Sequence, residues 1–351
     1  MFLLAALIIP LIPSGCAEEP QPIAETLTGP TMGTQYVVHL AQLPAGMSAG
    51  TIQTGVDQLL EQVNDQMSTY RPESEISQFN ASRSTEWFSV SAATARVVAK
   101  AQEISALSHG ALDVTVMPLV NLWSFGPEAR PDVVPTPEEL AARLQKIGYQ
   151  KLSVRLEPPG LKKADAELEV DLSAIAKGYG VDAVGEYLQS VGVANFMVEI
   201  GGEVLTQGHK GDGTAWRIGI ERPISTERAV QKILALETAA LATSGDYRNF
   251  FESGEKRYSH TIDPRTGQPI DHALAAVSII GDSCMEADGM ATAVMVLGPT
   301  EGYDWLLERD VAAVMYVKTA SGFEERATPA FEARFNTIEA RFNTKSPVDT
   351  P

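Results

Sequence analysis

The sequence predicts a mixed α+β fold: a single large, two-lobed domain in which helices flank sheets. Apolar helical stripes and short β-branched runs are interleaved along the chain without strict alternation. The length of 351 residues favours one large domain or two closely packed lobes. The lack of strict alternation argues against a doubly wound sheet. There is also no dinucleotide-binding fingerprint, because Gly178, Gly180 and Gly185 do not follow a strand with the required spacing.

Helices are predicted where apolar residues recur every three or four positions. The first, residues 51–67, has one apolar stripe made of Ile52, Val56, Leu59, Leu60, Val63 and Met67. The second, residues 91–110, has Ser91 as its N-cap and Gly110 as its stop. The others are residues 136–149, entered through Thr136 and Pro137, residues 177–192, residues 286–298, and a short helix at 300–308 capped by Thr300.

Strands are predicted where β-branched runs are bounded by turn residues. They lie at residues 36–40, 195–204, 215–221, 239–245, 257–263, 275–281 and 312–318, and the segment 168–172 is also strand-like.

Residues 1–16 are apolar and end in Ser14-Gly15-Cys16, which resembles a bacterial lipoprotein cleavage site. The apolar run is too short for a transmembrane helix, which needs ~20 apolar residues. We expect a signal sequence, lipidation at Cys16, and export to the periplasmic side of the inner membrane as a lipoprotein. A plain secretory signal or a weak membrane anchor is the alternative. Residues 17–29 are predicted to form a flexible, Pro/Glu-rich tether.

The last residues, 332–351, are predicted to be a tail outside the main domain. The unit EARFNT begins at Glu332 and again at Glu339, and two copies are too few for a solenoid or a coiled coil. A short terminal helix or a duplication explains it.

The net charge of −18 argues against a nucleic-acid partner, because phosphate backbones need basic patches. The sequence lacks HExxH, CxxC, GxSxG and P-loop motifs. Zinc hydrolysis, acyl transfer and P-loop phosphotransfer are therefore disfavoured. Cys284 is interpreted as a small buried residue rather than a nucleophile.

Several stretches carry residues suited to chemistry. On a helix, Asp288 and Thr292 share one face, and this carboxylate–hydroxyl pair suits a hard cation such as Mg²⁺. The alternative is that Asp288 only sits in the first helical turn, where a negative charge is favourable, and that the Thr292 hydroxyl only hydrogen-bonds its own helix backbone. Lys177, near a helix start after Asp171, could hold a phosphate or be an ordinary surface lysine. Gly201 and Gly202 either allow a bound group to approach the backbone closely or only form a structural turn.

A buried Asp113 would need hydrogen-bonding partners, because it sits among apolar residues. Trp123 and Phe125 could flank a flat ring or belong to the core. The stretch SHTIDPRTGQP brings His260, an acid and a tight turn together after a predicted strand.

The blocks MGTQY, MSTYRPESEISQFN, GALDVTVMPLVNLWSFGP, VDLSAIAKGYGVD, VEIGGEV, TSGDYRNFF, HTIDPRTGQP and EADGMATAVMVLG occur in this order. Together they resemble one family, the ApbE-type FAD:protein FMN transferases. Each block is weak alone, but the set is highly specific. The resemblance covers roughly residues 30–331, which it marks as the catalytic domain.

The resemblance implies one site for FAD and one for Mg²⁺. FAD would contact Met32, Tyr70, Ala111, Leu112, Asp113, Asp171, Lys177 and Ile262. Mg²⁺ would be held by the backbone carbonyl of Ala174 and by the side chains of Asp288 and Thr292, and this oxygen-only set suits the ion.

The implied reaction is Mg²⁺-dependent transfer of FMN from FAD. A threonine or serine hydroxyl of a partner protein would attack the FMN-side phosphorus, AMP would leave, and a phosphodiester would form. His260 is our candidate base, because its ordinary pKa of ~6.5 suits proton exchange near neutrality. Alternatively, His260 only hydrogen-bonds a phosphate or a neighbouring strand. The resemblance implies that the acceptors are subunits of membrane redox complexes that carry an acidic residue followed by Ser/Thr-Gly-Ala-Thr.

The sequence also allows rival functions of two classes. Within flavin chemistry, the protein could hydrolyse FAD or only store it. In another class, it could be a solute-binding lipoprotein that feeds a transporter.

Overall fold

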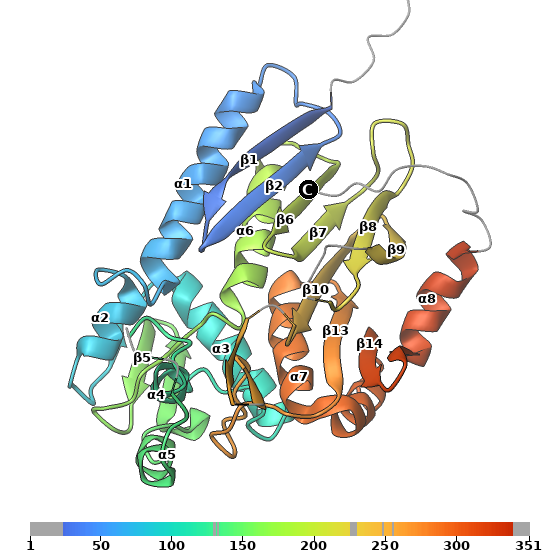
Figure 1. The fold of residues 1–351 in the computed structure, drawn as a ribbon. Helices are drawn as coiled ribbons and strands as arrows, with labels where there is room; N and C mark the ends of the chain where they lie inside the picture. Colours follow the sequence, from blue (N-terminus) through green and yellow to red (C-terminus); the bar gives the residue numbers. More distant parts are fainter. Residues whose placement is uncertain are drawn as a thin grey trace, which may run out of the picture.

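The computed structural model describes residues 24–339, except 129–130, 132, 225–229, 248 and 255. Within this part of the chain, an eight-stranded sheet with the order β1-β2-β6-β7-β10-β13-β14-β15 forms the centre of the fold (Figure 1). Every neighbouring pair in it is antiparallel. Its strands are β1 (Glu25–Thr31), β2 (Thr34–Leu40), β6 (Phe196–Ile200), β7 (Glu203–Gln207), β10 (Ala239–Gly245), β13 (Leu274–Gly281), β14 (Ala312–Thr319) and β15 (Gly322–Ala327).

Helices and three small sheets complete the described structure. The helices are α1 (Ala49–Met67), α2 (Glu75–Ala81), α3 (Ala92–Leu107), α4 (Met117–Leu122), α5 (Pro137–Leu144), α6 (Ala176–Ser190), α7 (Cys284–Leu307) and α8 (Pro329–Glu339), with a 3-10 turn at Tyr149–Lys151. The small sheets pair β3 (Phe88–Ser89) and β4 (Leu152–Leu156) with β5 (Pro159–Lys163), β8 (Trp216–Glu221) with β9 (Val230–Leu236), and β11 (Phe250–Ser253) with β12 (Lys256–Ser259). The prediction of a mixed α+β fold is confirmed.

The two faces of the large sheet are covered differently. Helices α1, α6 and α7 pack on one face, where residues such as Val56, Val184 and Ile200 form a continuous core. On the other face, the β8–β9 pair and α8 cover residues such as Val204 and Tyr316. Consecutive residues of a strand point to opposite faces, so each strand contributes to both cores.

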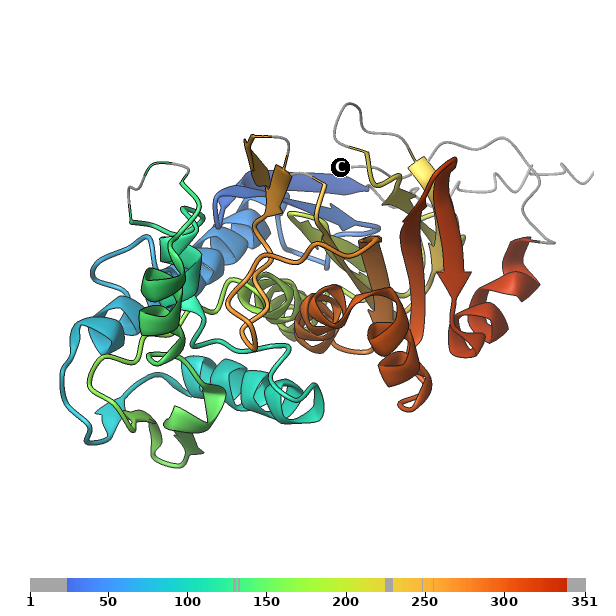
Figure 2. The same cartoon turned by 60° about the horizontal axis from the view of Figure 1, so that its bottom comes forward.

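A second region, built from α2 to α5 and the small sheet of β3, β4 and β5, packs beside the α7 side of the large sheet (Figure 2). Helix α3 joins the two regions, because it contacts β4 and β5 on one side and α7 on the other. The largest core of the molecule runs through this junction and includes Ile104, Leu172 and Met295.

The predicted helix starts are largely confirmed. Ser91 caps α3 by accepting a hydrogen bond from the Thr94 amide at 3.1 Å. Thr136 and Glu139 form a reciprocal capping box at the start of α5. The predicted break between the helix at 286–298 and the short helix at 300–308 is confirmed, because non-helical Gly298 kinks α7 and separates its last turns, up to Leu307, from the rest.

Two predicted boundaries are corrected by the structure. The tether predicted at residues 17–29 is wrong from Glu25 onward, because Glu25–Thr31 pairs along its whole length with Thr34–Leu40. The strand-like segment 168–172 is not a strand. Its backbone bonds instead to single partners: the Val170 amide donates to the Asn80 side chain, and the Asp171 amide donates to the Val114 carbonyl.

The predicted signal segment 1–16, with Cys16, lies outside the described residues, and so do residues 17–23 and 340–351. Helix α8 crosses the predicted start of the tail at residue 332 and buries Phe331 and Phe335. No helix in residues 24–339, as far as they are described, has the length and apolar character needed to cross a membrane. Cys284 is fully buried, as expected.

Candidate active site

Helices α6 and α7 approach each other closely at Gly178. A Cβ atom added to Gly178 would lie 2.3 Å from the carbonyl oxygen of Cys284 and 2.8 Å from Cβ of Asp288, so only glycine fits here. The Gly178 amide donates a hydrogen bond to Oδ2 of Asp288 at 2.9 Å. Since Gly178 lies in the first turn of α6, Asp288 satisfies an amide that the helix itself leaves without a partner.

The residues predicted to bind Mg²⁺ belong to α7 and to the segment that leads into α6, the two elements that make this contact. Asp288 and Thr292 are both in the regular part of α7, so they are one turn apart on one face, as predicted. Ala174 lies just before the α6 turn that Asp288 caps. The hydroxyl of Ser244, on β10, lies 3.4 Å from that of Thr292. Carboxylate, hydroxyl and carbonyl oxygens form a donor set that fits a hard divalent cation.

This donor set contains a single carboxylate. Accordingly, within the described ranges, no site gathers three or more His, Cys, Asp or Glu side chains in the manner of a metal cluster. A cation held here would complete its coordination with water and, when substrate is bound, with substrate oxygens, as is typical of Mg²⁺.

Lys177 lies between two buried carboxylates. Its Nζ is 3.0 Å from Oε2 of Glu203 and 3.6 Å from Oδ1 of Asp288. Burial alone would lower the pKa of Lys177, but the charges of Asp288 and Glu203 outweigh it and hold the pKa above its ordinary value. Burial raises the pKa of Asp288 and that of Glu203, and the positive charge of Lys177 opposes both shifts. The lysine therefore remains charged at neutral pH.

The segment 111–114 lies beside the segment that leads into α6. The Asp171 amide donates to the Val114 carbonyl at 2.8 Å. Asp113 has the partners that its burial requires: Oδ1 accepts from the amide and hydroxyl of Thr115, and Oδ2 accepts from the Tyr149 amide. Ala111, Leu112 and Asp113 are all buried, and their contact with FAD stays a prediction.

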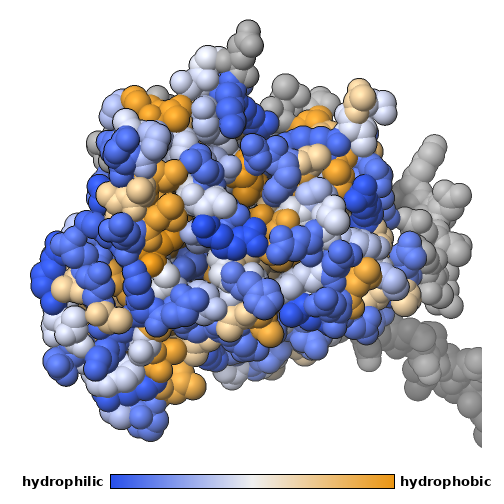
Figure 3. All heavy atoms as spheres, turned by 90° about the horizontal axis from the view of Figure 1, so that it is seen from below, coloured by the Kyte–Doolittle hydropathy of each residue, from blue (hydrophilic) through white to orange (hydrophobic). Residues whose placement is uncertain are grey.

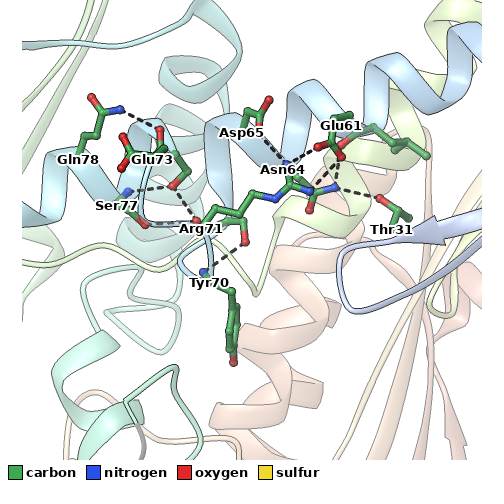
Figure 4. A network of polar contacts seen from close by, with 12 residues as sticks. Thr31, Glu61, Asn64, Asp65, Tyr70, Arg71, Glu73, Ser77 and Gln78 are labelled. Atoms are coloured by element: carbon green, nitrogen blue, oxygen red, sulfur yellow. Dashed lines mark hydrogen bonds and ion pairs between the residues drawn. The ribbon is translucent and has the colours of Figure 1, made fainter.

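Two residues from other parts of the chain also lie near the start of α6: Tyr70, which follows α1, and Met32, between β1 and β2. Tyr70 is 67% exposed and extends away from α1 (Figure 4). Partial burial and the negative charge of Asp171 raise the pKa of Tyr70, which places the ring near that carboxylate. Met32 lies in the turn between β1 and β2 with a positive φ of 47°, and it packs against Gly180 of α6.

His260 follows β12 directly and has a defined orientation. Its Nδ1 lies 2.9 Å from the carbonyl oxygen of Asn249, so Nδ1 carries the proton and Nε2 is the acceptor nitrogen. Burial lowers the pKa of His260, partly offset by the Asn249 carbonyl and the charge of Asp246. The positive charge of Lys177 lowers the pKa of His260 further, so His260 lies within electrostatic range of the α6–α7 contact.

The aromatic residues near His260 are structural. Trp123 is buried, its ring stacks on Tyr258 with centroids 5.4 Å apart, and its Nε1 donates to the Gly267 carbonyl. Ile262 belongs to the same cluster and is buried. Phe125 contacts the His260 ring edge-on at 6.3 Å between centroids. The alternative that Trp123 belongs to the core is the one the structure supports.

The structure thus brings Lys177, Asp288 and Thr292 together. Asp171 and Ala174 lie in the segment that leads into α6, and Tyr70 lies near Asp171. In Figure 2, α6 and α7 point towards the viewer, and the face seen from below is hollowed near its centre, with hydrophilic and hydrophobic patches around the hollow (Figure 3). Sequence reasoning missed Glu203 and Ser244. An acid inside the apolar run of VEIGGEV was the available signal for Glu203.

The chain is similar to proteins of known activity. Residues 32–315 match the ApbE family. A protein of Vibrio cholerae named FAD:protein FMN transferase is 50% identical over 329 residues, which cover 94% of this chain and 97% of the relative. A protein of the same name from Haemophilus influenzae is 40% identical over 333 residues, covering 93% and 95% of the two chains.

Solved structures agree with the sequence comparisons. The flavin transferase ApbE from Vibrio cholerae superposes with a TM-score of 0.83 at 50% identity, covering 89% of this chain and 100% of that one. The apo form of Pseudomonas stutzeri flavinyl transferase ApbE also has a TM-score of 0.83, at 40% identity, covering 91% and 98%.

Proposed function

The chain belongs to the ApbE family, and from this membership we infer that it is an FAD:protein FMN transferase, an enzyme that moves FMN from FAD to a partner protein. We propose further that the reaction depends on Mg²⁺, releases AMP, and leaves FMN on a threonine or serine hydroxyl as a phosphodiester. The observation that carries this proposal is the contact of Asp288 with the first turn of α6, which gathers a cation ligand and a lysine at one point.

The start of α6 suits the diphosphate of FAD. The helix dipole at the start of α6 favours an anion, and Lys177 brings its ammonium group to the same place. The small residues Gly178 and Gly180 let α7 and Met32 pack closely against this part of the helix.

Asp288, Thr292 and the carbonyl of Ala174 would hold Mg²⁺, since all three offer oxygen ligands near the same contact. When bound, the ion supplies positive charge that stabilises the negative charge on the phosphates during transfer. The protein contributes the fixed α6–α7 geometry, in which Gly178 orients one Asp288 oxygen and leaves the other facing the site.

Tyr70 is proposed to offer its face to the flavin ring, because it is an exposed aromatic residue beside Asp171. Met32, Asp171 and Ile262 would border the same ligand, together with the main chain at Ala111, Leu112 and Asp113. Asp171 is held in place by the amide and hydroxyl of Ser173, at 2.8 and 2.5 Å from its Oδ1.

His260 is proposed to be the general base. The acceptor hydroxyl oxygen forms a bond to the FMN-side phosphorus, and the bond from that phosphorus to the AMP oxygen breaks. The hydroxyl proton passes to Nε2, which is the unprotonated nitrogen because Nδ1 donates to the Asn249 carbonyl. Burial, which lowers the pKa of His260, keeps the ring neutral and able to accept the proton at pH 7.

Acceptors and location are proposed from the sequence. The apolar segment ending in Ser14-Gly15-Cys16 supports export and lipid anchoring at Cys16 on the periplasmic side of the inner membrane. An anchored enzyme there would meet subunits of membrane redox complexes as acceptors. Radiolabelled palmitate incorporation that is lost in Cys16→Ala would support the anchor, whereas incorporation into neither form would contradict it.

The test of the activity uses FAD, Mg²⁺ and an acceptor peptide with an acidic residue followed by Ser/Thr-Gly-Ala-Thr. Mass spectrometry should show a gain of one FMN moiety on the peptide, with AMP in equal amount. AMP without modified peptide would indicate hydrolysis of FAD instead, and neither product would indicate storage. Either result would contradict the proposal.

A further inference from the structure

Glu203 is a buried carboxylate that the proposed chemistry does not use. It opens β7 immediately after the Gly201–Gly202 turn and is only 2% exposed. Its Oε2 forms an ion pair with Lys177 at 3.0 Å but has no well-aligned hydrogen-bond donor in the described part of the chain. Burying a carboxylate with so few hydrogen-bond partners costs folding free energy, so we expect Glu203 to have a functional role.

The sheet directs Glu203 towards the helices. In the β6–β7 hairpin Glu203 pairs with Ile200, which packs in the core under α6. The next residue, Val204, points to the opposite face and packs with the β8–β9 side. Glu199 pairs with Val204 and therefore shares that opposite face. Of the two hairpin glutamates, only Glu203 faces the active site.

The contacts of Lys177 are unequal. Its Nζ lies at ion-pair distance from Glu203, 3.0 Å, but at 3.6 Å from Asp288, beyond a good hydrogen bond. The Asp288 oxygen that faces Lys177 is Oδ1, because Oδ2 accepts from the Gly178 amide. Oδ1 is therefore the oxygen for which a lysine ammonium and a divalent cation would compete.

We propose that Glu203 is a positioning residue that holds Lys177 on the β7 side of the α6–α7 contact and so keeps Oδ1 of Asp288 open for the cation. The proposal rests on the proposed function in taking Asp288 as a cation ligand. Without Glu203, the ammonium would have Asp288 as its one remaining carboxylate partner among those recorded for it. Like charges at such distances in a poorly solvated site repel strongly, so the lysine and the cation could not share Oδ1.

The experiment measures Mg²⁺ affinity by isothermal titration calorimetry on the purified full chain without FAD. Four proteins are compared: the wild type, Glu203→Gln, Lys177→Gln, and the double variant. We expect Glu203→Gln to weaken Mg²⁺ binding about 10-fold, a change typical of residues that orient a metal ligand. In the Lys177→Gln background, where no ammonium competes, the same substitution should change the affinity by less than about 3-fold.

Other outcomes overturn the proposal. An equal loss of affinity in both backgrounds would mean that Glu203 only attracts the cation through its charge. Unchanged affinity with a lower melting temperature would mean that Glu203 is merely structural. Glu199→Gln is the matched control, a buried glutamate on the other face of the same hairpin, and it should bind Mg²⁺ like the wild type.

If the double variant does not fold, Glu203→Asp replaces it. This change keeps the charge but shortens the side chain, so a positioning role predicts weakened binding, as in Glu203→Gln, and wild-type affinity would overturn it. Failure of the proposed function is distinguishable: if Asp288→Ala binds Mg²⁺ as tightly as the wild type, the cation site itself is misassigned, whatever Glu203 does.

Discussion

In two regions of the molecule a basic side chain lies between two carboxylates, which are buried in one region and exposed to solvent in the other. At the α6–α7 contact, Lys177 lies between Glu203 and Asp288, whose side chains are each 3% exposed. Beside α1, Arg71 lies between Glu61 and Asp65, whose side chains are 61% and 65% exposed (Figure 4).

The two clusters show that a short ion-pair distance does not by itself indicate a large contribution to folding stability. Arg71 binds Glu61 through two bonds of 2.7 and 2.9 Å and Asp65 at 2.6 Å, all shorter than the contacts of Lys177. Water screens the Arg71 cluster, so each exposed pair contributes at most about 1 kcal/mol. The Lys177 cluster is poorly screened, so removing one member leaves a buried charge without compensation.

Asp288→Ala should produce the largest effect. It removes a ligand of the proposed cation and the acceptor of the Gly178 amide. Loss of several kcal/mol of transition-state stabilisation corresponds to a fall of about 10³-fold in FMN transfer, measured by mass spectrometry of the acceptor. Glu286→Ala, one half-turn earlier on α7 and paired with Lys100, is the control and should retain activity. Transfer by Asp288→Ala at the wild-type rate would remove Asp288 from the mechanism.

Lys177→Met tests whether the buried ion pairs contribute more to folding stability than the exposed ones. Two buried carboxylates lose their cation, so the free energy of unfolding should fall by about 3 kcal/mol at pH 7, measured by urea denaturation. Lys146→Met, which breaks an exposed pair with Glu167, should cost less than about 1 kcal/mol. Equal losses in the two variants would show that burial does not separate the two classes of pair.

His260→Ala should lower the transfer rate about 10²-fold, the lower end of the range for general bases. The pH profile gives the sharper check. A base must be unprotonated, and burial lowers the pKa of His260, so the acid limb of kcat/KM should have its midpoint below the ordinary ~6.5. Protonation of His260 should also reduce folded stability only as the pH falls below ~6.5. An acid limb that persists unchanged in His260→Ala would assign it to another group.

Arg71→Gln should have the smallest effect. Its partners are exposed, so the unfolding free energy should fall by about 0.2–1 kcal/mol at low salt. In 1 M NaCl, where the screening length is ~3 Å, the difference from the wild type should largely disappear. A salt-independent loss above about 2 kcal/mol would mean that the exposed Arg71 pairs stabilise the fold as much as the buried Lys177 pairs, contrary to this expectation.

Much of the local structure could be predicted from the sequence. The apolar stripe of α1, the Ser91 and Thr136 caps, and the shared face of Asp288 and Thr292 all follow from spacings within a few residues. The predictions that proved wrong depended on partners elsewhere in the chain. Glu25–Thr31 is a strand because β2 pairs with it, although its composition resembles a tether.

The sequence by itself determined which residues could carry chemistry, because residue type and helical or strand period are local properties. Only the tertiary structure decided which of them meet. Glu203 joins Lys177 because the β6–β7 hairpin turns one face towards α6, and Asp288 reaches the start of α6 because Gly178 lets the two helices approach. Such contacts depend on how sheets and helices pack, and packing is set by the whole chain at once rather than by any short segment.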